Sequence, residues 1–205
     1  ERAFKNTATF QLQTPNSRFR AEVGGFYQHF LNYIYLQPQP DFRLTIRGAF
    51  PVFKYEQTKA QIAGTYLNIS YLAHKNIQIS GKYSLTRGQD IRQNIPLVAI
   101  PTDNWSAYLD VFLPNFSKFK KSYVKLNGQF VRNQTRLLAN QDFLSPPPAY
   151  YLAGLRIGTS AVFGKSRVNF SFEIQNLLNQ KYRDYLNRQR YFADEMGRNF
   201  VLRTN

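Results

Sequence analysis

Residues 168–175 alternate strictly between apolar and polar side chains. The apolar positions are Val168, Phe170, Phe172 and Ile174, and the polar positions between them are Asn169, Ser171, Glu173 and Gln175. A period of two places successive side chains on opposite faces of a β-strand. This segment is therefore expected to be a strand with one apolar and one polar face.

The same alternation recurs along the chain and divides it into nine candidate strands, each with one apolar face. The expected apolar sets are Ala8, Phe10 and Leu12; Ala21, Val23, Gly25, Tyr27, Leu31, Tyr33 and Tyr35; Ile62, Gly64 and Tyr66; Ile77, Ile79, Gly81, Tyr83 and Leu85; Trp105, Ala107, Leu109 and Val111; Val124, Leu126 and Phe130; Tyr151, Ala153, Leu155 and Ile157; and Val168, Phe170, Phe172 and Ile174. The last expected strand ends at Asn205. Turn residues separate the sets, so the pattern predicts an all-β antiparallel meander.

Short and long connections alternate between these strands. Short turns are expected at 14–17, 73–76 and 164–166, and long loops at 37–51, 87–103 and 133–148. Transmembrane barrels have short periplasmic turns and long extracellular loops, and their strands need only ~9–11 residues to cross the membrane. No segment approaches the ~20 apolar residues of a membrane helix. The chain is therefore interpreted as part of a transmembrane β-barrel.

Two motifs carry a family resemblance. One is Asn176, Leu177, Leu178, Asn179 and Tyr182, followed by Gly197, Arg198, Asn199 and Phe200; the other is the block 47–60. Together they resemble TonB-dependent outer-membrane receptors, particularly those of Bacteroidetes-type bacteria. The motif residues singled out are Asn176, Leu177, Tyr182, Gly197 and Arg198.

The resemblance implies that residues 1–205 form the C-terminal portion of a receptor barrel of about 22 strands. The resemblance also implies that the plug domain lies outside this chain. The intact protein is expected to lie in the bacterial outer membrane, in contact with lipid and lipopolysaccharide, and to take up a scarce nutrient such as an iron chelate, haem, cobalamin or glycan when TonB acts on the plug. In a fragment of a barrel, the first and last strands should be unpaired edges.

Composition constrains other functions. The net charge is +15, but its 27 cationic residues are spread along the chain rather than gathered into an arm, so no nucleic-acid partner is expected. Cysteine is absent, which excludes disulfides and thiolate metal sites. His29 and His74 lack nearby carboxylates in ligand-like spacing, and Met196 is isolated. We therefore expect no metal, no cofactor and no enzymatic activity.

The polar positions of the strands are expected to line the lumen. The residues chosen for this role are Arg20, Glu22, Lys59, Lys82, Lys125, Arg156 and Glu173, with Gln61 among their polar neighbours. Aromatic and cationic loop residues are expected to form an extracellular mouth that binds an anionic or aromatic ligand by stacking and charge-assisted hydrogen bonds. These are Tyr35, Arg43, Arg87, Arg92, Arg136, Tyr185, Arg188, Arg190 and Tyr191.

Two alternatives remain open at this stage. A small closed outer-membrane pore or lipid-binding barrel requires its first and last strands to pair. A soluble basic β-protein that binds single-stranded nucleic acid requires aromatic and cationic side chains on the same sheet face. Here most aromatic positions alternate with the cations, which favours the membrane barrel.

Overall fold

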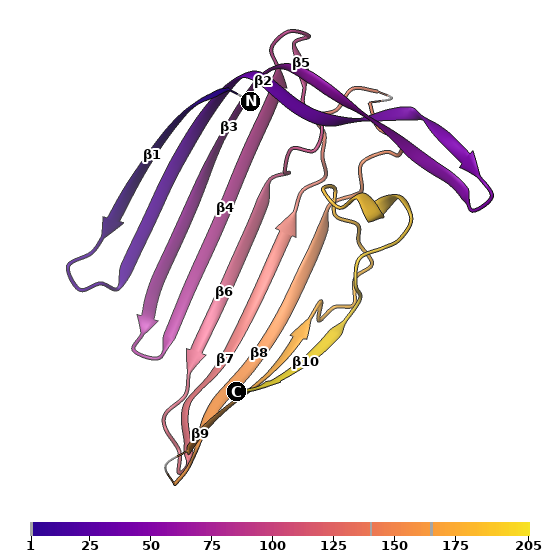
Figure 1. Ribbon diagram of the computed structural model, residues 1–205. Helices are drawn as coiled ribbons and strands as arrows, with labels where there is room; N and C mark the ends of the chain where they lie inside the picture. Colours follow the sequence, from indigo (N-terminus) through magenta and orange to yellow (C-terminus); the bar gives the residue numbers. More distant parts are fainter. Residues whose placement is uncertain (1, 140, 165) are drawn as a thin grey trace.

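The computed structural model describes residues 2–139, 141–164 and 166–205, and nearly all of its regular structure is β-strand (Figure 1). Lys165 of the expected tight turn lies outside the described residues. The strands are β1 (Ala3–Gln13), β2 (Phe19–Thr45), β3 (Gly48–His74), β4 (Ile77–Asp90), β5 (Ile95–Pro96), β6 (Asn104–Phe112), β7 (Phe119–Val131), β8 (Tyr150–Phe163), β9 (Ser166–Gln175) and β10 (Asn199–Thr204). A short 3₁₀ helix, η1, spans Arg188–Tyr191.

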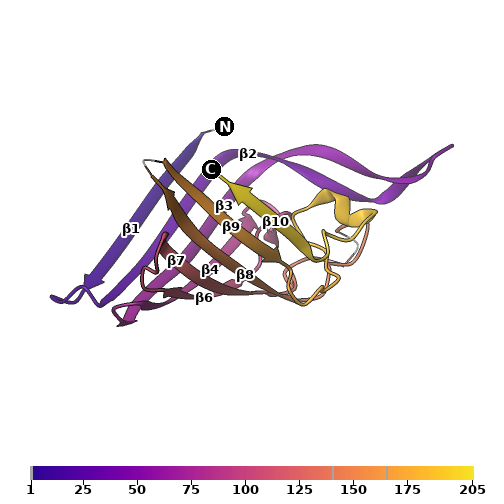
Figure 2. The same ribbon diagram turned by 90° about the horizontal axis from the view of Figure 1, so that it is seen from below.

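The strands form one antiparallel meander in which neighbours in sequence are neighbours in the sheet. Its order is β1-β2-β3-β4-β6-β7-β8-β9-β10, and the two-residue β5 pairs with the end of β4. The sheet is curved (Figure 2). Within the described residues, β1 pairs only with β2 and β10 only with β9, so the sheet is open. The expected all-β meander with two unpaired edge strands is thus confirmed.

One face of the sheet, here called the apolar face, carries continuous rows of large apolar side chains. The strand register aligns one such row as Ile79, Leu109, Leu126, Leu155, Ile174 and Phe200. Many of these side chains are exposed, including Ile79 and Leu126 at 49% and 43% of their surface. A soluble protein rarely leaves so extended an apolar face in water, whereas a membrane barrel turns such a face to lipid.

A second row of the apolar face is aromatic. Tyr83, Trp105, Phe130 and Tyr151 follow one another across four strands, with ring centroids 4.9, 5.4 and 4.5 Å apart. Offset aromatic contacts at such distances are favourable beyond their buried area. Rows of aromatic residues also mark the interfacial girdles of membrane barrels.

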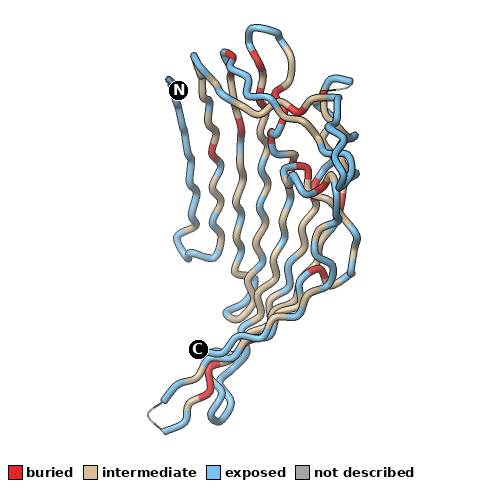
Figure 3. Tube along the Cα trace, turned by 45° about the vertical axis from the view of Figure 1, so that its right-hand side comes forward, coloured by how far each residue is buried: buried red, intermediate tan, exposed pale blue. Residues whose placement is uncertain are grey.

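The opposite face, here called the polar face, carries charged and amide side chains. Glu22, Asn68, Lys82 and Ser106 form one row across β2, β3, β4 and β6. Buried residues are few and lie mainly near the long connections (Figure 3). There Ala60, Leu97 and Ile100 form a small cluster, because the segment around β5 folds onto the sheet. No side-chain layer comparable to a soluble core covers the rest of the described sheet.

Connection lengths alternate as expected, except between β2 and β3. Tight turns join β1 to β2, β3 to β4, β6 to β7 and β8 to β9 at one end of the sheet, here called the short-turn end. Longer connections span 91–103, 132–149 and 176–198 at the other, here called the long-loop end. None of the described helices is long and apolar enough to cross a membrane.

The expected loop 37–51 is wrong, because these residues belong to a long hairpin. β2 and β3 extend beyond the rest of the sheet and pair up to Thr45 and Gly48. The hairpin crosses toward the loops of the distant strands (Figure 1). Pro38, Pro40 and Pro51 suggested a loop, but in this extension each strand has one free edge, where a residue without an N–H is tolerated.

In β2, some side chains lie on the opposite face of the sheet from the one expected. A register shift between Phe30 and Tyr33 inserts an extra residue, and such a bulge reverses the facing of all residues that follow. Tyr33 and Tyr35 therefore join Phe30 against the Ala60 cluster. They do not continue the face of Val23.

In β3 the two faces are the reverse of those expected. Tyr66 lies on the polar face, where its ring occupies the space that a Cβ at Gly24 would need. Ile62 and Gly64 share that face through strand alternation. Lys59 and Gln61 accordingly lie on the apolar face, and they are not neighbours of Glu22.

Candidate functional site

The predicted mouth residues are not all in loops. Tyr35 and Arg43 lie in β2, and Arg87 lies in β4, where its guanidinium is 2.7 Å from Asp103 Oδ1. Arg92 and Arg136 are exposed on separate connections at the long-loop end. The predicted mouth residues therefore divide into exposed cations and a set of packed side chains around Arg190, here called the packed group.

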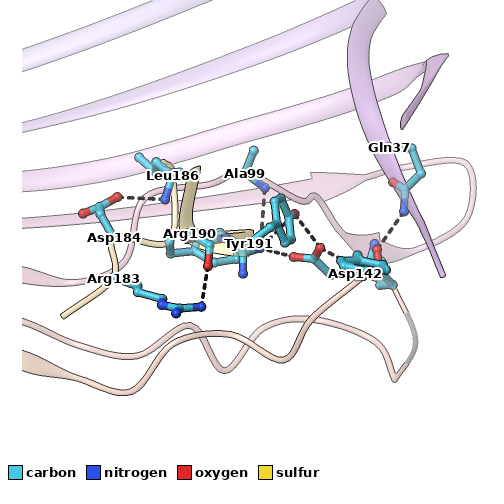
Figure 4. A network of polar contacts seen from close by, with 11 residues as sticks. Gln37, Ala99, Asp142, Arg183, Asp184, Leu186, Arg190 and Tyr191 are labelled. Carbon is cyan, nitrogen blue, oxygen red and sulfur yellow. Dashed lines mark hydrogen bonds and ion pairs between the residues drawn. The ribbon is translucent and has the colours of Figure 1, made fainter. Parts of the chain in front are cut away.

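The packed group centres on Asp142 (Figure 4). Its carboxylate pairs with Arg190 and accepts a hydrogen bond from the Tyr191 hydroxyl at 2.6 Å. Arg190 is only 5% exposed, and its guanidinium lies between the rings of Tyr185 and Tyr191, at 5.1 and 4.4 Å. Tyr185 in turn accepts a hydrogen bond from the Ala99 N–H at 3.2 Å. Arg190 therefore joins three connections to one another and has little surface left for a ligand.

Burial governs the electrostatics of the two tyrosines. Desolvation raises the pKa of Tyr191, and its hydrogen bond to Asp142 raises it further. Burial also raises the pKa of Tyr185. Both hydroxyls thus remain protonated at neutral pH, which keeps Tyr191 a donor to the carboxylate.

The β2–β3 hairpin extension packs onto this group through aromatic side chains. Phe53 lies 6.0 Å from the Tyr191 ring, and the Arg188 guanidinium stacks over Phe53 at 5.3 Å. Phe50 contacts Phe192, with centroids 5.7 Å apart. These contacts fix the hairpin over the long-loop end, a packing that sequence patterns did not indicate.

A cavity of about 310 Å³ lies beside the packed group. Its lining combines Pro146, Pro147 and Pro148 with Tyr182 and the cations Lys181 and Arg183. Arg183 is already bonded to Asp194 at 2.6 Å and to the Arg190 carbonyl at 2.7 Å. Lys181 and the prolines were missed by the sequence analysis, although three consecutive prolines indicate a rigid segment.

The motif residues close the base of the 176–198 connection. Asn176 is buried with a φ of 48°, and its amide donates to the Gln180 carbonyl at 2.9 Å while accepting from the Gln180 N–H at 2.9 Å. Arg198 donates through Nε to the Leu177 carbonyl at 3.0 Å. Tyr182 packs on Tyr150. These side chains hold backbone, so the motif has a structural role here.

On the polar face, six of the seven expected residues share one side of the sheet, all but Lys59. Three ion pairs connect its strands: Lys125 with Asp110 at 2.9 Å, Arg156 with Glu173 at 2.6 Å, and Arg203 with Glu173 at 2.6 Å. Asp110 and Arg203 were not among the expected residues. Within the described residues, no group of three or more His, Asp or Glu side chains is placed to hold a metal ion.

Comparison with solved structures identifies the fold. The copper transporter OprC superposes with a TM-score of 0.77 at 16% identity, over 98% of this chain and 30% of OprC. The FrpB iron transporter of Neisseria meningitidis gives 0.69 at 15%, over 98% and 30%. The ferripyoverdine receptor of the Pseudomonas aeruginosa outer membrane gives 0.65 at 15%, over 98% and 26%.

No protein-family model and no curated protein sequence matches the chain. The chain spans less than a third of the length of each of these three structures. This chain thus has the fold of one part of the β-barrel of TonB-dependent outer-membrane receptors.

Proposed function

We propose that this chain forms part of the outer-membrane barrel of a TonB-dependent receptor for the uptake of a scarce nutrient. The observation that carries the proposal is the open sheet itself. Its apolar face is exposed, its polar face carries ion pairs, and each edge strand is paired on one side only within the described residues. Backbone groups cannot remain unpaired in lipid, so further strands must complete the barrel.

The nutrient is proposed to be a metal ion or metal chelate, with haem, cobalamin and glycans as further members of the same uptake class. The similar structures named above are a copper transporter, an iron transporter and a ferripyoverdine receptor, which favours metals. Energy is proposed to come from TonB acting on a plug domain elsewhere in the intact protein. The chain is proposed to have a transport role and no catalytic role in this scheme.

The exposed cations at the long-loop end are the proposed ligand contacts. They are Arg43, Arg92, Arg136 and Arg188. Arg190, Tyr185 and Tyr191 are instead proposed to hold the loops in position, because their polar atoms are used within the packed group. Arg87 is likewise held by Asp103.

Uptake by cells tests the proposal. A strain that lacks the intact gene should lose energy-dependent accumulation of one compound from a panel of radiolabelled ferric chelates, copper, haem and cobalamin. Uptake should return with the gene and stop when TonB is deleted. Exchange of Arg136 for Gln should weaken binding of that compound, whereas Lys75→Gln at the short-turn end should not. Normal uptake of the whole panel without the gene, together with unchanged growth on glycans, would refute the receptor function.

The small closed pore gains no support from the pairing pattern. Such a pore needs hydrogen bonds between β1 and β10, and within the described residues neither strand has a second partner. A small closed pore would be recognised by a discrete conductance of the 205-residue chain in planar bilayers.

A further inference from the structure

Two polar atoms are buried without a hydrogen-bond partner at the base of the β2–β3 hairpin extension. They are Oδ2 of Asp90 and Oγ1 of Thr58, and no other buried side-chain nitrogen or oxygen of the described residues lacks a partner. Asp90 is fully buried, and Thr58 is 4% exposed. Because nearly all buried polar groups in folded proteins are hydrogen-bonded, two such atoms in one region indicate a missing partner.

The strand register brings both side chains to the same side of the sheet. Asp90 pairs directly with Ala60, and Thr58 lies two residues before Ala60 in β3. Directly paired residues point to one face, and so do residues two apart in a strand. Thr58 and Asp90 are therefore diagonal neighbours on the polar face, with a typical separation of about 7–8 Å. One atom between their side chains can contact both.

The carboxylate of Asp90 has no cation beside it. Its Oδ1 accepts hydrogen bonds from the N–H groups of Arg92 at 2.8 Å and Gln93 at 3.1 Å, and these hold the turn after β4. No Lys or Arg side chain of the described residues forms an ion pair with Asp90. A buried carboxylate is strongly disfavoured unless it is paired or coordinates a metal. The partner that Oδ2 lacks should therefore carry positive charge.

Tyr35 and Glu56 add oxygen atoms and negative charge to the same region. They pair directly across β2 and β3, two residues from the pair of Tyr33 and Thr58. Burial raises the pKa of Tyr35, and the carboxylates of Asp90 and Glu56 raise it further. Both carboxylates thus act on the Tyr35 hydroxyl. All of these groups offer oxygen, the atom that hard cations prefer.

We propose that a divalent cation of the calcium type binds Asp90 Oδ2 and Thr58 Oγ1 at the base of the hairpin extension. Calcium accepts oxygen ligands in flexible geometry, whereas magnesium requires a near-ideal octahedron. The Tyr35 hydroxyl and water supply further ligands. With one buried carboxylate, the affinity should resemble that of extracellular calcium modules, with a Kd of about 10⁻⁴–10⁻³ M. The expectation of no metal rested on cysteine, histidine and methionine, and it did not consider oxygen ligands from distant residues.

The cation joins two parts of the long-loop end. Thr58 belongs to the hairpin extension, whereas Asp90 ends β4 and holds the turn that follows it. The extension also packs on the loops, with Phe53 6.0 Å from Tyr191. Loss of the cation should therefore loosen the extension at its base. The ion is a resident part of the wall and not the transported nutrient, so the inference goes beyond the proposed uptake.

Terbium luminescence of the intact protein in detergent tests the site. Tb³⁺ occupies calcium sites and emits when tyrosines close to it are excited, so Tyr33 and Tyr35 should sensitise its emission. An excess of Ca²⁺ should displace Tb³⁺ and remove that emission. Hydrogen exchange of the 33–58 amides should also be slower in Ca²⁺ than in a chelator.

Three variants separate coordination from folding. Asp90→Asn keeps an oxygen for the turn N–H groups but replaces Oδ2 with a donor, and it should weaken Ca²⁺ binding by at least about tenfold, the loss typical of changes around a metal. Thr58→Val keeps the shape without Oγ1 and should give a smaller loss. Asp110→Asn is the matched control, because this partly exposed carboxylate is paired with Lys125, and it should leave Ca²⁺ affinity unchanged.

Equal Ca²⁺ affinity and equal hairpin protection in wild type and Asp90→Asn would overturn the inference. Tb³⁺ emission that Ca²⁺ does not displace would do the same. If Asp90→Asn fails to fold, Thr58→Val decides the question, because unchanged affinity in that variant removes one of the two proposed ligands. Nutrient uptake is not the readout, so failure of the cation site leaves the receptor function to the uptake experiment.

Discussion

The side-chain oxygen of Asn179 accepts a hydrogen bond from the backbone N–H of Arg198 at 2.9 Å. The same oxygen lies 3.0 Å from the position that a Cβ at Gly197 would take, so a larger residue there would crowd the contact. Asn179 itself has a φ of 52°, a conformation that asparagine tolerates better than most residues. This contact closes a connection of more than twenty residues at its base.

Asn179→Ala should therefore open the base of the connection. The variant loses one hydrogen bond and places a Cβ-bearing residue without a polar side chain in left-handed backbone, for a combined cost of about 2 kcal/mol. Asn179→Gly keeps the backbone relaxed and should cost only about 1 kcal/mol. Hydrogen exchange at the Arg198 amide provides the measurement. Equal protection in wild type and both variants would show that the contact is unimportant.

Successive residues of β7 lie on opposite faces of the sheet. Substitutions at neighbouring positions should therefore change the free energy of membrane insertion by unequal amounts. Leu126→Lys places a charge in the middle of the apolar face and should destabilise insertion into lipid by about 2–4 kcal/mol. Asn127→Lys, one residue away on the polar face, should cost much less. Folding of the intact protein into vesicles, followed in urea, compares them. Glu173 is unsuitable for such a control because it holds Arg156 and Arg203.

Breaking the Arg190–Asp142 pair should release the loops. Arg190→Met leaves a buried carboxylate without its cation, which typically costs about 3–5 kcal/mol. The double variant Arg190→Met with Asp142→Leu removes both charges and should recover much of that loss. Proteolysis within 176–198 and hydrogen exchange of the same segment report local opening. A double variant as labile as the single one would argue against a direct coupling.

High pH should destabilise the packed group that contains Tyr185, Arg190 and Tyr191. Burial raises the folded-state pKa of Tyr185 and Tyr191 above the ordinary value of about 10. Their contribution to stability is therefore complete below pH of about 10 and is lost as the pH rises through the folded-state pKa. Protection of the 183–194 amides, corrected for intrinsic exchange, should fall in that range. Tyr191→Phe should reduce the fall, and an unchanged profile would contradict this origin.

The alternation of apolar and polar residues predicted the sheet well, because the two faces of a barrel strand lie in different environments. Ile79, Leu109 and Leu126 were expected on apolar faces, and the register aligns them in one row. The alternation failed where the backbone departs from regular pairing. A bulge after Phe30 reverses the facing of Tyr35, and no residue in that stretch marks its position.

Loop contacts were less predictable than strands. Asp142 and Arg190 are 48 residues apart, and nothing in either local sequence indicates that they meet. Arg190 was expected in an accessible ligand site with Tyr185 and Tyr191, but in the structure it is buried and its charge is paired with Asp142. The hairpin extension was mistaken for a loop because proline usually interrupts strands, and only the free edges of β2 and β3 make Pro38 and Pro51 acceptable there.

The open edges lead to the last prediction. β1 (Ala3–Gln13) is eleven residues long and pairs with β2 on one side only, so alternate residues leave their N–H and C=O groups unpaired on the other side. Each unsatisfied group in hydrocarbon costs several kcal/mol. The 205-residue chain by itself should therefore fail to insert stably into planar bilayers, should show no discrete conductance and should aggregate without detergent. Extension of the chain by the strands that complete its barrel should restore insertion. A steady unitary conductance from the chain alone would instead require β1 to pair with β10, and would establish a small closed pore in place of a receptor segment.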